Sequence, residues 1–317
     1  MAKPKRALVL SGGGGRGAYQ AGVWRFLEEV GWLPDVVTGT SVGSLNAALI
    51  GMGWDGRQLE DFWKRIERKS VYRSSLWQQL LASWRLRRPG RSPAGLLDPT
   101  PLRRLLEEVI DLESLRRSQI EVITTAVHVA TARLRYFDSS QIGIDHLMAS
   151  CAIPVVFPWQ LIDGEPHWDG GLMANTPVGP ALRSGAVEVV AVLLAPLAGT
   201  ASKLPRTRLQ ALEWAIEIST LGSAATAVEP FIGSPKNPPL KHQSREQIHE
   251  LEGRRLAVVA PRELLGFHSV LGFDGTKAQQ LTQMGYRDAQ AQLSSFFDGT
   301  EPAKPNRLTH STRPDAG

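Results

Sequence analysis

The chain has 317 residues, of which 42% are hydrophobic and 21% are charged, and its formal net charge at pH 7 is +5. This composition excludes an intrinsically disordered chain and provides enough apolar side chains for one large core or two small ones. The single cysteine, Cys151, excludes an intrachain disulfide, so the fold does not depend on oxidation.

The N-terminal segment combines a basic stretch, MAKPKR, with the apolar run ALVL, which glycines follow. A run of four apolar residues is shorter than the roughly 7–15 residues of a secretion-signal core. The pattern therefore predicts a buried first strand over residues 6–11. No stretch approaches the roughly 18 apolar residues that a membrane span requires, so we expect a cytoplasmic protein that contacts membranes at most peripherally.

Helix and strand patterns alternate along the rest of the chain. Apolar spacing predicts helices at 17–30 and 44–51 and a long amphipathic helix at 277–297. Short apolar runs predict strands in PDVVTGTS, EVITTAVHVA, ARLRYFDS, VEVVAVLLAP and RRLAVVAP, of which the second and third should form an edge hairpin. This alternation predicts an α/β fold, a three-layer α/β/α sandwich with a mostly parallel central sheet.

No linker divides the chain into two complete strand-and-helix patterns, so the sequence favours a single domain. We expect one domain over residues 1–297, with a variable, basic, helical insertion around 54–120. Proline, glycine and polar residues predict irregular segments at 85–101 and 229–245. The polar, proline-containing end of the chain, residues 298–317, is predicted to be disordered.

A nucleophile candidate lies in VVTGTSVGSLNAA, where Gly39 and Gly43 flank Ser41 in a G-x-S-x-G pattern. A strand leads in and a helix leads out, so Ser41 lies at a strand-to-helix turn, above the sheet and at a helix N-terminus that favours developing negative charge. The alternative is a tight turn whose serine only caps the helix.

The glycine run LVLSGGGGRGAYQAG follows the first strand. Gly12, Gly14 and Gly17 fit a dinucleotide fingerprint, but Thr40 and Ser41 stand at the end of the second strand, where that fingerprint needs an acidic residue. Because both loops follow parallel strands, they meet at one edge of the sheet, where backbone amides beside a serine would form an oxyanion hole. Arg16 would then anchor the loop or attract a phosphate.

A nucleophilic serine needs a base, and two kinds of residue are candidates. One is a histidine in a Ser-His-Asp triad, whose members can follow the chain order Ser…Asp…His. His242, His249 and His268 all come late enough in the chain, and only His268 is hard to dismiss as a surface residue. The other candidate is Asp169 in PHWDGGLMANTP, among His167, Trp168, Leu172 and Met173, where an apolar setting would raise its basicity. It would then accept the serine proton directly.

At this point the sequence resembles the patatin-like phospholipases, a family of patatin-like acyl hydrolases. Four blocks match in order, SGGGGRGAYQAGV, GTSVGSLNAA, ASCAIPVVFP and WDGGLMANTP, and GFDGTKAQQLTQMGYRDA is similar to the family's closing helix. The resemblance covers most of residues 6–297 and is weak across 53–120.

The resemblance implies a patatin-like fold and a Ser-Asp catalytic dyad that needs no histidine. Carried over, Ser41 is the nucleophile and Asp169 the base, and the oxyanion hole comes from the loop residues Gly13, Gly14, Gly15 and Arg16. The motif glycines are Gly12, Gly17, Gly39, Gly43, Gly170 and Gly171. The implied activity is hydrolysis of lipid acyl esters, of a phospholipid, lysophospholipid or related lipid, through an acyl-enzyme intermediate. No cofactor or metal is expected.

Two other functions remain open on the sequence. One is a Ser-His-Asp esterase that acts on small esters, and the other is a non-catalytic lipid- or nucleotide-binding module built on the glycine loop. Asn175 and Pro177 are expected to brace the loop after Asp169, and Cys151 to be a buried, unreactive thiol because no basic group adjoins it.

The net positive charge of one segment is larger than the net positive charge of the whole chain. Residues 57–104 hold twelve Lys/Arg and four Asp/Glu, with Trp63, Trp77 and Trp84 among them. Either this segment is a solvated helical cap whose tryptophans pack on the core, or it is a membrane-facing lid that binds anionic headgroups. Nucleic-acid binding is not expected, because the charge is local and no binding module surrounds it.

Overall fold

The computed structural model describes residues 3–74, 95–196, 253–263 and 270–297, the strand at 248–251, and isolated positions at 206, 214, 218–219, 222–223, 225–227 and 265. The predictions for the irregular segment 229–245, for Trp77 and Trp84, and for the C-terminal segment 298–317 lie outside the described residues. Within the described part of the chain, no helix has the length and apolar character that crossing a bilayer requires.

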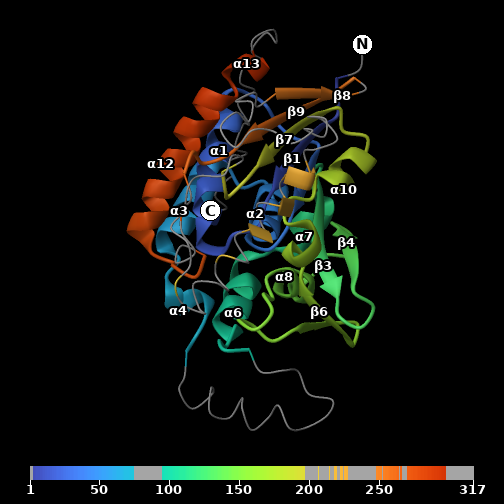
Figure 1. Cartoon of the computed structure of the whole chain (residues 1–317), viewed down its shortest axis with the longest axis vertical. Helices are drawn as coiled ribbons and strands as arrows, with labels where there is room; N and C mark the ends of the chain where they lie inside the picture. The colour runs from blue at the N-terminus through green and yellow to red at the C-terminus, as the bar shows by residue number, and fades with distance from the viewer. Residues whose placement is uncertain are drawn as a thin grey trace, which may run out of the picture.

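One mixed sheet forms the centre of the molecule (Figure 1). Its central strands are parallel and lie in the order β3 (Glu121–His128), β2 (Val36–Gly39), β1 (Arg6–Leu10), β7 (Glu188–Val192) and β9 (Arg254–Val259). Antiparallel strands extend both flanks: β6 (Glu165–Asp169) and β5 (Gln160–Ile162) beyond β3, and β8 (Ile248–Leu251) beyond β9. The predicted α/β fold is confirmed, with antiparallel pairing confined to the flanks.

The edge hairpin is also present. Strand β4 (Arg133–Asp138) pairs antiparallel with β3 from Ile123 to His128, and β3 pairs with β2 through its first half and with β6 through its second. The β3 strand therefore connects the parallel centre to the strand that ends at Asp169.

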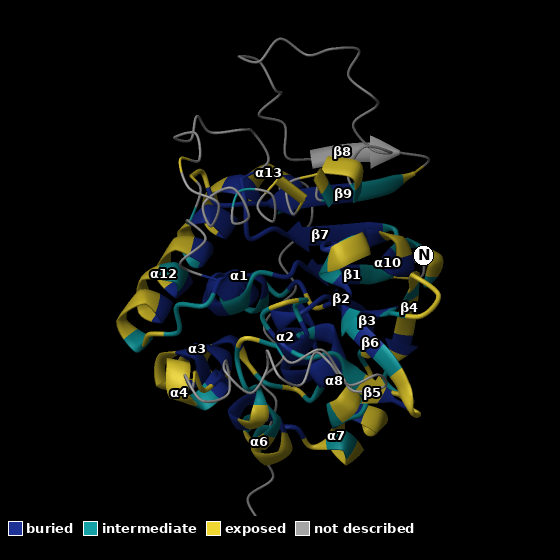
Figure 2. Cartoon of the chain, turned by 60° about the horizontal axis from the view of Figure 1, so that its bottom comes forward, coloured by how far each residue is buried: buried dark blue, intermediate teal, exposed yellow. Residues whose placement is uncertain are grey.

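Apolar residues alternate between the two faces of the central strands, so each face has its own core. Leu8 and Leu10 of β1 belong to one cluster, whereas Ala7 and Val9 belong to the other. Figure 2 shows the buried centre of the sheet between helices whose outer faces are exposed. Because strands buried on both faces are apolar throughout, their sequences read as continuous hydrophobic runs.

Helices cover both faces of the sheet. On the larger side lie α1 (Ala18–Glu29), α2 (Val42–Gly51), α3 (Gly56–Arg65), α6 (Thr100–Val109), α8 (Ile144–Ser150) and α12 (Gly275–Gln292). On the opposite side, α10 (Val178–Arg183) packs on β1 and β2. Shorter helices are η1 (Gly14–Gly17), α4 (Arg68–Val71), α7 (Leu112–Arg117), α9 (Gly171–Ala174) and α13 (Ser294–Phe297). The three-layer prediction is confirmed.

The helix α1 is buried on nearly all sides, because α12 crosses it closely. A Cβ atom on Gly22 would lie 1.9 Å from the Thr282 carbonyl oxygen, and one on Gly285 would lie 2.0 Å from that of Tyr19. Only glycines permit this approach. The predicted helix at 277–297 is two helices in the structure, since α12 ends at Gln292 and α13 starts at Ser294.

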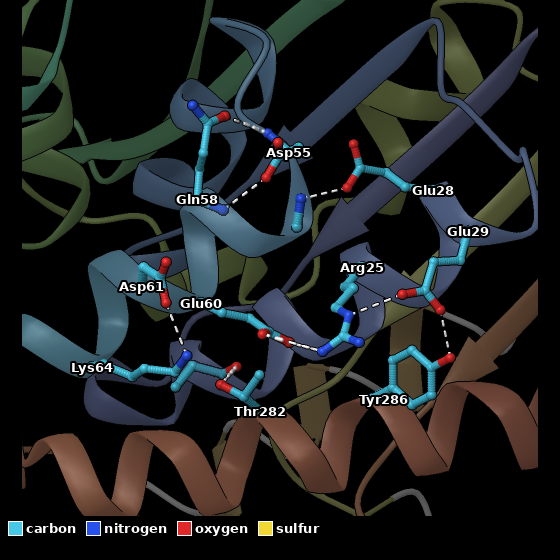
Figure 3. Close-up of polar contacts among 12 residues, drawn as sticks. Arg25, Glu28, Glu29, Asp55, Gln58, Glu60, Asp61, Lys64, Thr282 and Tyr286 are labelled. Carbon is cyan, nitrogen blue, oxygen red and sulfur yellow. Dashed lines mark hydrogen bonds and ion pairs between the residues drawn. The ribbon is translucent and has the colours of Figure 1, made fainter. Parts of the chain in front are cut away.

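Polar contacts hold α1, α3 and α12 together on their outer side (Figure 3). Arg25 pairs with Glu29 at 3.0 Å and with Glu60 at 3.3 Å, and its guanidinium lies over the ring of Tyr286. Tyr286 in turn donates a hydrogen bond to Glu29 at 2.5 Å. This network keeps α3, which carries an apolar face toward the site described below, against the two long helices.

The described part of the region 54–120 contributes to the core. Leu59, Phe62, Leu106 and Leu115 are buried, and Trp63 is 2% exposed. The Nε1 group of Trp63 donates to the side-chain oxygen of Asn46 at 3.0 Å. Trp63 therefore packs on the core, as expected if the segment is a helical cap, and is not available to a membrane surface.

Candidate active site

Ser41 occupies the sharp turn between β2 and α2. Its backbone has φ 55° and ψ −127°, a conformation that costs a non-glycine residue on the order of 1–3 kcal/mol. A Cβ atom on Gly39 would lie 2.2 Å from the Gly43 carbonyl oxygen, and one on Gly43 would lie 2.2 Å from that of Leu10. The two glycines therefore let the helix start directly against the strands.

The side chain of Ser41 makes no helix-capping hydrogen bond, although Ser41 is the N-cap residue of α2. The interpretation of this serine as only a helix cap is therefore wrong. The residue is 6% exposed, and its hydroxyl lies close enough to the carboxylate of Asp169 to lower the pKa of that carboxyl.

Asp169 is the last residue of β6 and is 5% exposed. Its backbone N–H donates to the Ala152 carbonyl at 3.0 Å, and the Gly171 N–H donates to its Oδ1 atom at 2.7 Å. Burial raises the pKa of this carboxyl to about 7, although the hydrogen bonds from Gly171 and Ser41 act in the opposite direction. The arrangement suits a proton acceptor near neutral pH.

The source of this burial differs from the prediction. Leu172 and Met173 are 50% and 53% exposed, so they do not desolvate Asp169. The carboxylate is buried because β6 pairs with β3, which places Asp169 opposite Ala126, and because the segment around Ala152 covers it.

The glycine loop lies beside Ser41, as predicted, but its amides are not all free. The Gly15 N–H donates to the Val270 carbonyl at 2.9 Å, and the Arg16 N–H donates to the Gly13 carbonyl at 3.3 Å. The expectation that all four residues, Gly13 to Arg16, supply oxyanion donors is therefore too broad. Among the described residues, no acceptor contacts the amides of Gly13 and Gly14.

Arg16 has the first of its two predicted roles. Its side chain is 1% exposed, and Nη1 donates to the Leu194 carbonyl at 3.2 Å. A guanidinium that is buried in this way anchors the loop and cannot reach a phosphate in solvent.

Asn175 joins the glycine loop to the segment after Asp169, as expected. The Gly12 N–H donates to the Asn175 carbonyl at 3.1 Å, and the Asn175 side-chain amide donates to the Gly12 carbonyl at 3.3 Å. The remaining motif glycines also make close contacts: Gly17 faces Val42 and Trp63, and Gly170 faces Thr125.

An apolar pocket opens at Ser41. Its wall combines Ser41 and Gly14 with apolar side chains of α2, α3, α4, α6 and the segments at 151–157 and 270–273, which include Leu45, Phe62, Trp63, Leu102, Phe157 and Phe273. Apart from Ser41, the lining side chains are hydrophobic, so the pocket suits a hydrocarbon chain. It was not anticipated, because its walls come from segments far apart in the sequence.

Cys151 lies in the wall of this pocket beside Ser41. Burial raises the pKa of its thiol well above the usual range, and the charge of Asp169 acts in the same direction. The thiol is therefore kept protonated and poorly nucleophilic, as expected from the sequence, although Cys151 is half-buried rather than fully buried.

Three histidines have partners away from Ser41. His128 contacts Thr131 and Glu165, the Nδ1 atom of His146 accepts a hydrogen bond from the Gly143 N–H, and that of His167 lies 2.9 Å from the Glu165 carbonyl. His249 is part of β8. His242 and His268 lie outside the described residues. In the described part of the chain, no group of three or more His, Cys, Asp or Glu side chains could hold a metal ion.

Sequence reasoning missed Ser150, whose hydroxyl accepts a hydrogen bond from the Ser41 N–H at 2.9 Å. It also missed Val270, which contacts the glycine loop. Neither carries a local pattern that distinguishes it, although Ser150 does lie in one of the blocks that carry the family resemblance.

Comparisons with known proteins identify related sequences and a related fold. The family profile described as patatin-like phospholipase matches residues 8–182. A cGAMP-activated phospholipase of Vibrio cholerae is 29% identical over 198 residues, which are 54% of this chain and 55% of that protein. Lysophospholipase NTE1 of Yarrowia lipolytica is 28% identical over 185 residues, 58% of this chain and 12% of that protein.

Among solved structures, human GIVD cytosolic phospholipase A2 has a similar fold, with a TM-score of 0.54 and 13% identity over 93% of this chain and 59% of that one. The chain spans about half the length of the first curated relatives it matches. Since the family profile covers more than half of the chain, including the Ser41 turn, the glycine loop and Asp169, the chain belongs to the patatin-like phospholipase family.

Proposed function

We propose that the protein is a serine acyl hydrolase that cleaves acyl esters of a phospholipid, lysophospholipid or related lipid. The observation that carries this proposal is the proximity of Ser41 to the buried carboxyl of Asp169, with Ser41 in the wall of an apolar pocket. The names of two relatives, a phospholipase and a lysophospholipase, support this substrate class. We assign the activity to one domain over residues 1–297.

In the proposed mechanism, Asp169 accepts the proton of Ser41 while the Ser41 oxygen attacks the ester carbonyl carbon. The amides of Gly13 and Gly14 and the N-terminus of α2 stabilise the oxyanion. Collapse of the tetrahedral intermediate expels the alcohol, which takes the proton from Asp169. Water activated by Asp169 then attacks the acyl-enzyme, and the fatty acid leaves with regeneration of Ser41.

A fluorophosphonate probe and a release assay test this proposal together. We expect the probe to label the wild type at Ser41, and expect faster release from long-chain lipid esters than from short-chain esters, because the pocket is apolar. Repeating the assay on anionic vesicles at several salt concentrations tests contact of the basic segment with a membrane. A wild type that neither reacts with the probe nor releases acid would instead indicate a binding module.

The pH dependence of kcat/KM should report the ionisation of Asp169. Since burial raises its pKa to about 7, we expect log(kcat/KM) to rise with pH up to about 7 and to level off above it. The measurement uses an ester substrate without ionisable groups between pH 4 and 9. A profile that is already level at pH 5 would contradict the role of this carboxyl as a buried base.

Replacement of His268 separates the dyad from a Ser-His-Asp triad. We expect His268→Ala to keep kcat/KM within about threefold of the wild type, whereas loss of a triad histidine typically costs at least about 10⁴-fold. His242→Ala and His249→Ala are the matched controls. A loss above about 10³-fold in His268→Ala alone would favour the triad.

A further inference from the structure

The backbone of Ser41 depends on support from outside its own turn. Its left-handed φ of 55° is unfavourable for serine, and its N–H is buried. That N–H donates to the Ser150 hydroxyl oxygen at 2.9 Å, at the end of α8. Without this acceptor, the amide of the strained residue would have no partner among the described residues.

The hydroxyl of Ser150 belongs to a buried chain whose proton directions follow from counting donors. Ser44 donates its single proton to the Gly39 carbonyl at 2.8 Å, and Thr124 donates to Ser44 at 2.5 Å. The Ser44 and Ser150 oxygens are 2.8 Å apart, so the proton between them must come from Ser150. Ser150 therefore presents a lone pair to the Ser41 N–H. All three hydroxyl residues are 0% exposed.

The same short segment also holds the second reacting group. Two residues after Ser150, the Ala152 carbonyl accepts the Asp169 N–H at 3.0 Å, and Cys151 between them faces the pocket beside Ser41. Residues 150–152 thus contact the backbones of both Ser41 and Asp169.

We propose that Ser150 is a positioning residue for the Ser41 nucleophile, and that residues 150–152 set the relative positions of Ser41 and Asp169. This inference rests on the proposed function. Ser150 contacts the Ser41 backbone, and its hydroxyl points to Ser44 and Ser41 rather than to the ester. It acts by holding Ser41 in the conformation that directs its oxygen toward Asp169, with the Ser44 hydroxyl and the Gly39 carbonyl as its anchor.

The test compares Ser150→Ala with the matched control Ser139→Ala. The Ser139 hydroxyl also accepts a backbone N–H, from Val122 at 2.7 Å. Ser139 follows Asp138, which pairs with Ile123 near the start of β3, whereas Asp169 pairs with Ala126 in its second half. We expect Ser150→Ala to lower kcat about 10- to 100-fold, because Ser41 is then held less well in its reactive conformation. KM should stay within about threefold of the wild type, because the apolar pocket at Ser41 is unchanged. The rate of fluorophosphonate labelling should fall by the same factor, whereas Ser139→Ala should change neither.

Rescue and a second variant complete the test. Ser150→Thr keeps the hydroxyl and should recover at least a third of the wild-type kcat. Ser44→Ala removes the acceptor of the Ser150 proton without altering residues 150–152, and should lower kcat about 3- to 10-fold. If Ser150→Ala does not fold, the kcat of Ser44→Ala tests the inference in its place.

Each of three results would overturn the inference. The first is a folded Ser150→Ala variant whose kcat equals that of Ser139→Ala. The second is a Ser150→Thr variant whose kcat is no higher than that of Ser150→Ala, and the third is a Ser44→Ala variant whose kcat is within twofold of the wild type. An inactive, unlabelled wild type would instead overturn the proposed function itself, so the two failures are distinguishable.

Discussion

Ser41→Ala should lower kcat/KM for a lipid ester by at least about 10⁴-fold and abolish covalent labelling by a fluorophosphonate. The reason is that no acyl-enzyme forms without the hydroxyl. The fold should persist, because that hydroxyl makes no capping hydrogen bond to α2. Circular dichroism and a thermal melt check folding, and mass spectrometry of the labelled protein checks the site of attachment.

Ser295→Ala is the matched control, since Ser295 is exposed on α13 and far along the chain from the site. It should keep wild-type activity and labelling. If Ser41→Ala still turned over the substrate at a tenth of the wild-type rate or more, Ser41 would not be the nucleophile.

Asp169→Asn should also lower kcat/KM by at least about 10³-fold, because asparagine cannot accept the Ser41 proton. Its side-chain oxygen can still accept the Gly171 N–H, so the loop after β6 keeps its hydrogen bond. Asp163→Asn, at an exposed position in the turn between β5 and β6, is the control and should be fully active. An active Asp169→Asn variant would contradict the proposed dyad.

The same variant has an expected stability signature. The pKa of Asp169 is raised from 3.8 to about 7 in the folded protein, so its favourable contribution is fully present below about pH 4 and is lost as the pH rises through about 7. Relative to the wild type, Asp169→Asn should therefore gain stability between pH 5 and pH 8, by at most about 3 kcal/mol. Thermal melts of both proteins across this range measure the difference, and a parallel pH dependence would show that the carboxyl is not buried.

The amino-acid sequence predicted the central elements well, because their signals are local. Apolar runs such as the one ending at Leu10 are buried on both sheet faces. Gly39 is required by its close contact with Gly43 in the same strand-turn-helix unit, whereas Gly43 is required by the neighbouring strand β1. The ends of elements were less accurate: α2 starts at Val42 rather than Ser44, and the last helix breaks before Ser294.

Side-chain exposure near the site was harder to predict than residue type. Leu172 and Met173 are apolar yet exposed, whereas the charged Arg16 is buried against the Leu194 carbonyl. In each case the outcome depends on which distant segment packs there. The same holds for the loop amides, since only the position of Val270 determines that the Gly15 N–H is occupied.

The sequence by itself determined the fold class and the residue types of the site: a serine on a glycine-flanked turn, a glycine loop and an aspartate before two glycines. Only the tertiary structure decided how these parts are supported, through the apolar pocket, the raised pKa of Asp169 and the hydroxyl chain behind Ser150. The physical reason is that motifs reflect short-range backbone geometry, whereas burial and hydrogen-bond partners depend on residues that meet only when the sheet has formed.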